Sequence, residues 1–176
     1  MKIIANVRNS RDNHQVNLFT SDMIHSLQIP SKATGFGSGV NGEELLLLAL
    51  ATSYCNALYD EAEKKGIVVN SVDVKVEGTF GEEGERAGEI RYSAIVKAEA
   101  AEKEILDLMH HTDAIAAVQN MLRRSVRVTL HKAVAISTVP APLKPDIFKR
   151  FLHPLAPVET LIHITDQVDA HHPLFI

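Results

Sequence analysis

The segment from Asn41 to Gly66, NGEELLLLALATSYCNALYDEAEKKG, constrains the fold more than any other part of this chain. Its first half is apolar at nearly every position, and charged residues gather only toward its end. Asn41 is a favourable N-cap, and Gly66 suits the left-handed residue that follows a helix. A helix that is apolar on every face must be buried on every face. The sequence therefore predicts a long buried helix through the middle of the fold.

Runs with a period of two surround this helix. Residues 2–7 and 14–20 flank a polar turn and predict a hairpin, and residues 24–29 predict a third strand. After the helix, alternating apolar and polar residues predict three further strands, at 72–76, 90–98 and 126–136. Two more helices are predicted, one over 101–110 and one that Thr112 or Asp113 caps and that runs to about Arg124. This mixture predicts the α+β class.

The last part of the chain differs from the rest. Residues 1–138 are predicted to form one domain, and residues 139–176 a proline-rich C-terminal extension, because six of the seven prolines lie there. The extension is also rich in Leu, Ile, Val and Phe, which argues against disorder. We expect it to pack on the body or on a partner subunit.

Composition narrows the function. The net charge of -4 argues against nucleic-acid binding, and the basic residues Arg123, Arg124 and Arg127 are interpreted as a solvated helix end and strand face. One cysteine excludes an intramolecular disulfide and fits a reducing, cytoplasmic compartment. The N-terminus has no signal-peptide pattern, and no apolar run is long enough to span a bilayer. The histidine spacing favours no metal site, and no motif indicates a cofactor.

The order of hairpin, glycine-bearing loop, buried helix, strand pair, helix pair and strand, together with the 41–66 sequence, resembles the OsmC/Ohr family of hydroperoxide-reducing proteins. The resemblance covers about residues 1–136. It implies two β-sheets around two central buried helices, in an intertwined homodimer with its sites at the interface. It also implies a hydroperoxide or another small apolar molecule as the ligand.

Active members of that family use two cysteines, assisted by a glutamate and an arginine. The resemblance places Glu43 at the position of the acid, with Arg8 and Arg11 as candidates for the substrate-orienting arginine. Counting from Glu43, the family's spacing for the reactive thiol falls on Ser53. Cys55 lies about 200° further around the helix, because each residue advances about 100°. We therefore expect it to face away from the catalytic direction.

The second thiol position also departs from the family. The run from Ala116 to Leu122 aligns with a family motif that begins with the resolving cysteine, so Ala116 takes that cysteine's place. The resemblance thus implies a hydroperoxide-response protein whose thiol peroxidase activity is weak, altered or lost.

Three interpretations of the helix residues stay open. Cys55 is either a one-cysteine peroxidatic nucleophile or a small buried hydrophobe. Ser53 is a hydrolase nucleophile only if a base such as His110 or His111 lies within hydrogen-bond reach. A binding module without chemistry, which holds a small apolar ligand at the dimer interface, is the remaining alternative.

Overall fold

The computed structural model describes residues 2–21, 23–81 and 88–140. The described residues up to Val139 belong to one compact unit. Apart from its first two residues, the predicted C-terminal extension lies outside the described residues. The division of the chain at residue 138 therefore stays a prediction.

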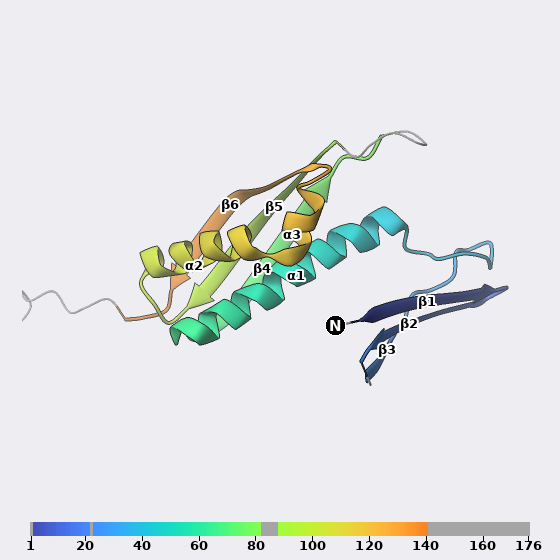
Figure 1. Ribbon diagram of the computed structural model, residues 1–176, viewed down its shortest axis with the longest axis horizontal. Coiled ribbons are helices and arrows are strands. Elements are labelled where there is room, and N and C mark those ends of the chain that lie inside the picture. Colours follow the sequence, from blue (N-terminus) through green and yellow to red (C-terminus); the bar gives the residue numbers. More distant parts are fainter. Residues whose placement is uncertain (1, 22, 82–87, 141–176) are drawn as a thin grey trace, which may run out of the picture. The chain divides into compact units, whose positions relative to one another are not determined.

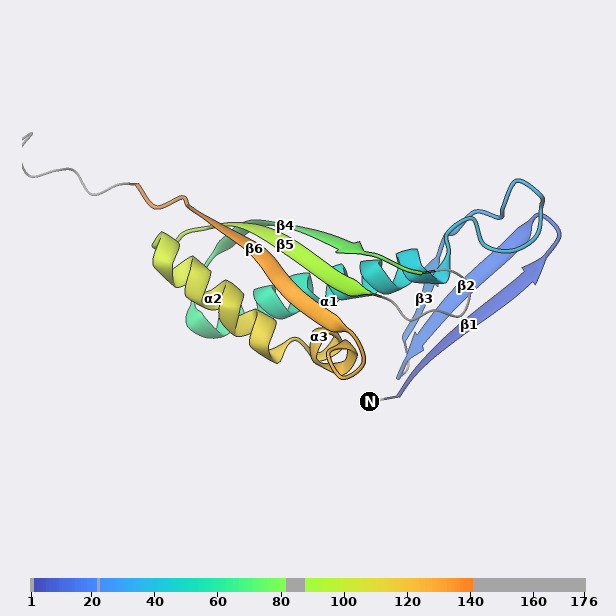
Figure 2. The ribbon, with the colours of Figure 1, turned by 90° about the horizontal axis from the view of Figure 1, so that it is seen from above.

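The body of the molecule is a three-stranded sheet with helices on one face (Figures 1 and 2). Strand β5 (Glu89–Ala98) lies between β4 (Val69–Gly78) and β6 (Arg127–Ser137). The β4–β5 pair is antiparallel, whereas the β5–β6 pair is parallel. A parallel pair needs a crossover connection, and α2 (Glu102–Ile115) and α3 (Ala117–Leu122) supply it.

Helix α1 (Gly42–Lys65) has well-formed ends. The Asn41 side chain accepts a hydrogen bond from the Glu44 amide at 2.7 Å, and the Glu44 carboxylate accepts one from the Asn41 amide at 2.8 Å. This capping box satisfies two of the N–H groups that a helix start leaves without partners. Gly66 ends the helix with a φ of 66°, where glycine has no steric penalty.

The core lies between the helices and one face of the sheet. From β5 every second residue points into it, which is the strand period of two. The buried apolar residues from α1, α2 and β5 include Leu50, Tyr54, Leu58, Leu108, Met109, Ile90, Tyr92 and Val96.

The N-terminal strands form a separate antiparallel sheet in the order β1 (Ile3–Ser10), β2 (Asn13–Thr20), β3 (Met23–Leu27). Val7 pairs with Val16, and Val16 pairs with Leu27, so these three side chains share one face. Among the described residues, the three strands pack chiefly on one another. Val16 is buried on this face, whereas Val7 keeps 59% and Leu27 39% of its surface exposed, so the face is covered only in part.

The structure confirms the α+β class, the two sheets, the hairpin and the long central helix. It corrects two predictions. Helix α1 is not buried on every face within one chain, because Leu48 keeps 53% of its surface exposed. Thr112 and Asp113 do not start a helix, because α2 runs through both and the break falls at Ala116.

Candidate functional site

The two nucleophile candidates lie on opposite flanks of α1. The residues that α1 buries deepest in the core, Leu50, Tyr54 and Leu58, define its inward face. Ser53 and Cys55 are both half-buried. At about 100° per residue they lie on either side of that inward face, about 200° apart. A single pocket on one flank of α1 therefore cannot use both side chains.

Cys55 lies in an environment that opposes ionisation. Burial raises the pKa of its thiol above the ordinary value. Because the thiolate is the nucleophile, a raised pKa leaves less of the reactive form at neutral pH. Reactive cysteines in proteins are activated in the opposite direction, by cations or helix N-termini. Cys55 is half-buried in α1 and has no such activation from its partial burial.

Ala116, at the resolving position, lies at the break between α2 and α3. It is buried, its ψ of 119° is not helical, and its amide donates to the Thr112 carbonyl at 2.9 Å. Its methyl group offers no redox chemistry.

One hydrogen bond joins the segments that carry both thiol positions. Gln119 Nε2 of α3 donates to the Leu50 carbonyl of α1 at 3.1 Å. Ser53 lies three residues after Leu50, and Ala116 three residues before Gln119, so each belongs to the neighbouring surface of its own segment. That Ser53 and Ala116 belong to one site at the contact between α1 and α3 stays a prediction.

The other predicted site residues lie elsewhere. Glu43 is exposed in the first turn of α1, and the ten residues to Ser53 correspond to an axial rise of about 15 Å. Arg8 is exposed in β1, and Arg11 lies 3.8 Å from Asp12 in the hairpin turn. Within the described residues, no ion pair joins either arginine to Glu43. These side chains do not form one constellation in the single chain.

Sequence reasoning missed a polar network around Asp113. The Asp113 carboxylate accepts hydrogen bonds from the Tyr92 hydroxyl and from the Arg123 guanidinium. Arg123 also donates to the carbonyls of Asp113 at 2.8 Å and of Val128 at 3.1 Å. Arg123 was expected in a solvated basic cluster, but it ties α2, the end of α3 and β6 together. No sequence pattern predicts this role, because Asp113, Arg123 and Val128 belong to three different elements whose packing brings them together.

A tyrosine pair extends this network toward α1. The Tyr54 and Tyr92 rings meet edge to face with centroids 5.1 Å apart, and the Tyr54 hydroxyl donates to the Met109 carbonyl at 3.0 Å. Burial and the nearby Asp113 raise the pKa of both phenols. Both tyrosines are therefore neutral donors that fix the packing of α1, α2 and β5.

A second cluster links α1 to α2, where it joins Glu61 to His111. Glu61 is only 8% exposed, and its carboxylate lies 2.5 Å from Lys64 Nζ and 3.2 Å from His111 Nε2. The hydrogen bond from Lys64, with a smaller effect of His111, holds the pKa of Glu61 below its usual value. His111 is thus engaged with Glu61, two helical turns away from Ser53, and no hydrogen bond of the described chain joins Ser53 to a histidine.

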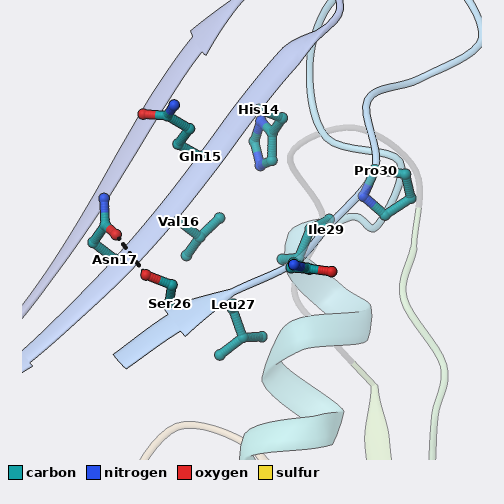
Figure 3. A pocket seen from close by; sticks show the side chains of 9 residues that line it. His14, Gln15, Val16, Asn17, Ser26, Leu27, Ile29 and Pro30 are labelled. Carbon is teal, nitrogen blue, oxygen red and sulfur yellow. Dashed lines mark hydrogen bonds between the residues drawn. The ribbon is translucent and has the colours of Figure 1, made fainter. Parts of the chain in front are cut away.

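An open groove of about 710 Å³ lies in the N-terminal sheet, where β3 ends beside β2 (Figure 3). Its polar lining includes a hydrogen bond from Ser26 to Asn17 at 3.1 Å. The residues that line it are His14, Gln15, Val16, Asn17, Ser26, Leu27, Gln28, Ile29 and Pro30. None of the predicted site residues lines it.

Across residues 2–21, 23–81 and 88–140, no cluster of three or more His, Cys, Asp or Glu side chains has the arrangement of a metal site. None of the helices in those ranges has the length and apolar character to cross a membrane.

Comparison with known families decides the identity of the fold. The family model described as OsmC-like protein matches residues 35–131, from the loop before α1 into β6. The chain belongs to the OsmC family. The matched range includes Glu43, Ser53, Cys55 and Ala116, but it leaves out β1, β2 and β3.

Solved OsmC-type structures share this fold. An OsmC-like protein from Mycoplasma pneumoniae has a TM-score of 0.58 at 17% identity, over 77% of this chain and 96% of that one. An organic hydroperoxide resistance protein from Elizabethkingia anophelis has a TM-score of 0.54 at 19% identity, over 77% and 96% of the two chains. A Legionella pneumophila protein of the same description has a TM-score of 0.51 at 18% identity, over 76% and 97%. No curated protein matches the sequence.

Proposed function

We propose that this OsmC-family protein belongs to the organic-hydroperoxide response group, with its thiol peroxidase activity weak, altered or lost, and that it binds small apolar molecules at the interface of a homodimer, in the region where α3 contacts α1. The position of Cys55 carries this proposal. The single thiol lies on the flank of α1 opposite Ser53, and burial raises its pKa. With alanine at position 116, no second thiol exists to trap an oxidised cysteine.

The names of similar proteins support the substrate class. The structures from Elizabethkingia anophelis and Legionella pneumophila are described as organic hydroperoxide resistance proteins. Their identity to this chain is below one fifth, so the likeness supports the group and leaves the activity as the proposal.

The proposed functional unit is a homodimer. The exposed large apolar residues Ile3, Val7 and Met23 lie on one face of the N-terminal sheet, and Leu48 and Tyr59 lie on the outward face of α1. Such contiguous apolar surface is typical of protein interfaces. A second copy would cover both surfaces and enclose the proposed ligand site.

Peroxide chemistry at Cys55 can be measured directly. We expect cumene hydroperoxide to give at most sulfenic or higher oxides on Cys55, or an intermolecular disulfide, by mass spectrometry. Turnover driven by dithiothreitol should stay near that of Cys55→Ala. Rapid catalytic turnover that disappears in Cys55→Ala would contradict the proposal and make Cys55 the working nucleophile.

The placement of the ancestral site can be tested by restoring both thiols. We expect Ser53→Cys with Ala116→Cys, in a Cys55→Ala background, to form a disulfide on oxidation, which requires Cα atoms about 4.4–6.8 Å apart. The matched control is Ala116→Cys alone, which pairs the new thiol with native Cys55. A disulfide in the control and none in the triple variant would show that Cys55, not Ser53, occupies the ancestral position.

Restored chemistry is the further expectation. The triple variant should gain hydroperoxide reductase activity with a dithiol reductant, because it carries an attacking and a resolving thiol. The rate at which iodoacetamide alkylates the thiol introduced by Ser53→Cys, measured across a range of pH, would give the pKa of the attacking group. Turnover would be measured over the same pH range.

The binding-module alternative has one supporting observation. Gln119, at the same α1–α3 contact, has a buried amide oxygen without a partner among the described residues. The hydrolase alternative has no such support, because His111 is engaged with Glu61.

A further inference from the structure

The Gln119 amide is held in one orientation. The side chain is fully buried, and its Nε2 donates to the Leu50 carbonyl at 3.1 Å. Its Oε1 is enclosed and accepts no hydrogen bond within the described part of the chain. Turning the amide over would place Oε1 against the Leu50 oxygen, two acceptors in contact. The unsatisfied group is therefore the carbonyl oxygen, and it lies where α3 meets α1.

An enclosed acceptor without a donor destabilises the state that contains it. The buried hydroxyls of Tyr54 and Thr112 donate elsewhere, to the carbonyls of Met109 and Leu108. The oxygen also has almost no accessible surface, so a water molecule does not reach it in this structure. A ligand that brings a hydrogen-bond donor to Oε1 stabilises the bound state by the hydrogen bond that the free protein does not make.

We propose that Gln119 is the specificity-determining residue of the α1–α3 site, where its Oε1 accepts a hydrogen bond from the O–H or N–H group of a small, otherwise apolar, neutral ligand. This inference rests on the ligand site of the proposed function. Because Oε1 is enclosed in the free protein, the ligand reaches it when the six residues of α3 move away from α1. The apolar remainder of the ligand lies against the aliphatic surface of α1. The single O–H or N–H group of the ligand sets the specificity of binding. Molecules of the same shape without a donor leave Oε1 unsatisfied and bind more weakly.

The test compares two probes on the full chain. Cumyl alcohol has an O–H donor, and its methyl ether has a similar apolar body without one. The measured quantity is the dissociation constant of the ether divided by that of the alcohol. We expect this ratio to be about tenfold larger in the unsubstituted protein than in Gln119→Met, because a hydrogen bond to a buried group changes a dissociation constant by about this factor. Dissociation constants from NMR titration give the ratio for each protein. Comparing ratios cancels the difference in hydrophobicity between the probes.

Thr112→Val is the matched control, because it removes a buried hydroxyl that bonds only within its own helix. It should keep the preference for the alcohol. An equal alcohol-to-ether ratio in the unsubstituted protein and Gln119→Met would overturn the inference while leaving the ligand site intact. Binding of neither probe to the unsubstituted protein would overturn both.

A measurement without ligand tests the premise separately. If Oε1 is unsatisfied in the free protein, Gln119→Met should lose no more than the hydrogen bond from Nε2 to the Leu50 carbonyl contributes, which is at most about a tenfold fall in the folding equilibrium constant in urea unfolding. A fall of more than about tenfold in its folding equilibrium constant would show that the amide is fully satisfied, and the inference would fail whatever the binding result.

Discussion

The helix-covered sheet of β4, β5 and β6 and the N-terminal sheet of β1, β2 and β3 have the same number of strands but treat their apolar side chains differently. In the first sheet, Ile90, Tyr92 and Val96 are fully or almost fully buried beneath helices of the same chain. In the second, Ile3 and Val7 each keep 59% of their surface exposed. A sheet needs at least one covered face to be stable. The body therefore has its core within one chain, whereas the N-terminal sheet buries Val16 but leaves Ile3 and Val7 largely exposed.

The largest effect should come from charging the exposed apolar face of the N-terminal sheet. Ile3 and Val7 share that face, so Ile3→Lys with Val7→Lys should abolish the proposed dimer. Full burial of two such side chains contributes about 3–6 kcal/mol per copy. Light scattering at micromolar concentration should show a dimer for the unsubstituted protein, burying more than the ~2,000 Å² at which obligate interfaces begin, and a monomer for the variant.

Asn6→Lys with Gln15→Lys is the matched control, because Asn6 and Gln15 are exposed polar residues on the opposite face of the same sheet. The control should remain dimeric. If the unsubstituted chain is already a stable folded monomer, the homodimer proposal is wrong and the N-terminal sheet is stable without a partner copy.

The next effect concerns the body, where stability should not depend on association. Leu58→Ala removes a fully buried side chain of α1. The loss of apolar burial and the remaining cavity should lower the free energy of unfolding by about 2–5 kcal/mol. Thermal and urea unfolding at two protein concentrations would measure it. Leu48→Ala, on the exposed face of the same helix, should change the unfolding of the body much less, and equal losses would contradict the contrast between the two faces of α1.

The same contrast explains what the sequence could predict. Helix α1 and the β1–β2 hairpin were predictable because caps, turns and periodicity are local signals. The opposite flanks of Ser53 and Cys55 followed from the helix period alone. The break at Ala116 was not predictable, because the Asp113 carboxylate, which looks like a cap, is bound by Tyr92 from β5 and by Arg123. Long-range partners decided that region.

The burial of Gln119 was equally hidden. Nothing in the sequence of α3 distinguishes a glutamine that faces solvent from one that bonds to the Leu50 carbonyl, 69 residues away. The family resemblance located the two thiol positions. The role proposed for the Gln119 amide could be inferred only from the packing of α3 on α1.

A smaller effect is expected from the Asp113 network. Arg123 and Asp113 are about three-quarters buried, with 27% and 24% of their side chains exposed. Arg123→Ala should lower the free energy of unfolding by about 1–3 kcal/mol, because it leaves the Asp113 carboxylate and two carbonyls with fewer donors. Urea unfolding measures the loss. Arg124→Ala, one residue along and exposed, is the control, and a similar loss there would show that Arg123 is only a solvated surface residue.

The smallest effect is a pH-dependent one, at the Glu61 contact between α1 and α2. The Lys64 and His111 hydrogen bonds lower the pKa of Glu61 from 4.5. A carboxyl group whose pKa is lower in the folded state stabilises that state above its unfolded pKa, and the contribution is lost as the pH falls through the folded value. Glu61→Gln should therefore be slightly less stable than the unsubstituted chain near pH 7, and the gap should close below about pH 4.5.

Unfolding curves at pH 7, 5 and 4 would show whether the gap narrows on acidification. Glu63→Gln is the control, since Glu63 is exposed two residues further along α1 and should show little change with pH. A gap for Glu61→Gln that stays constant from pH 7 to pH 4 would mean that the carboxylate charge is not what joins the two helices. The glutamine side chain of the variant would then hold α1 and α2 together as well as the carboxylate does. The stability of the body would depend on apolar packing even where its helices meet through charged groups.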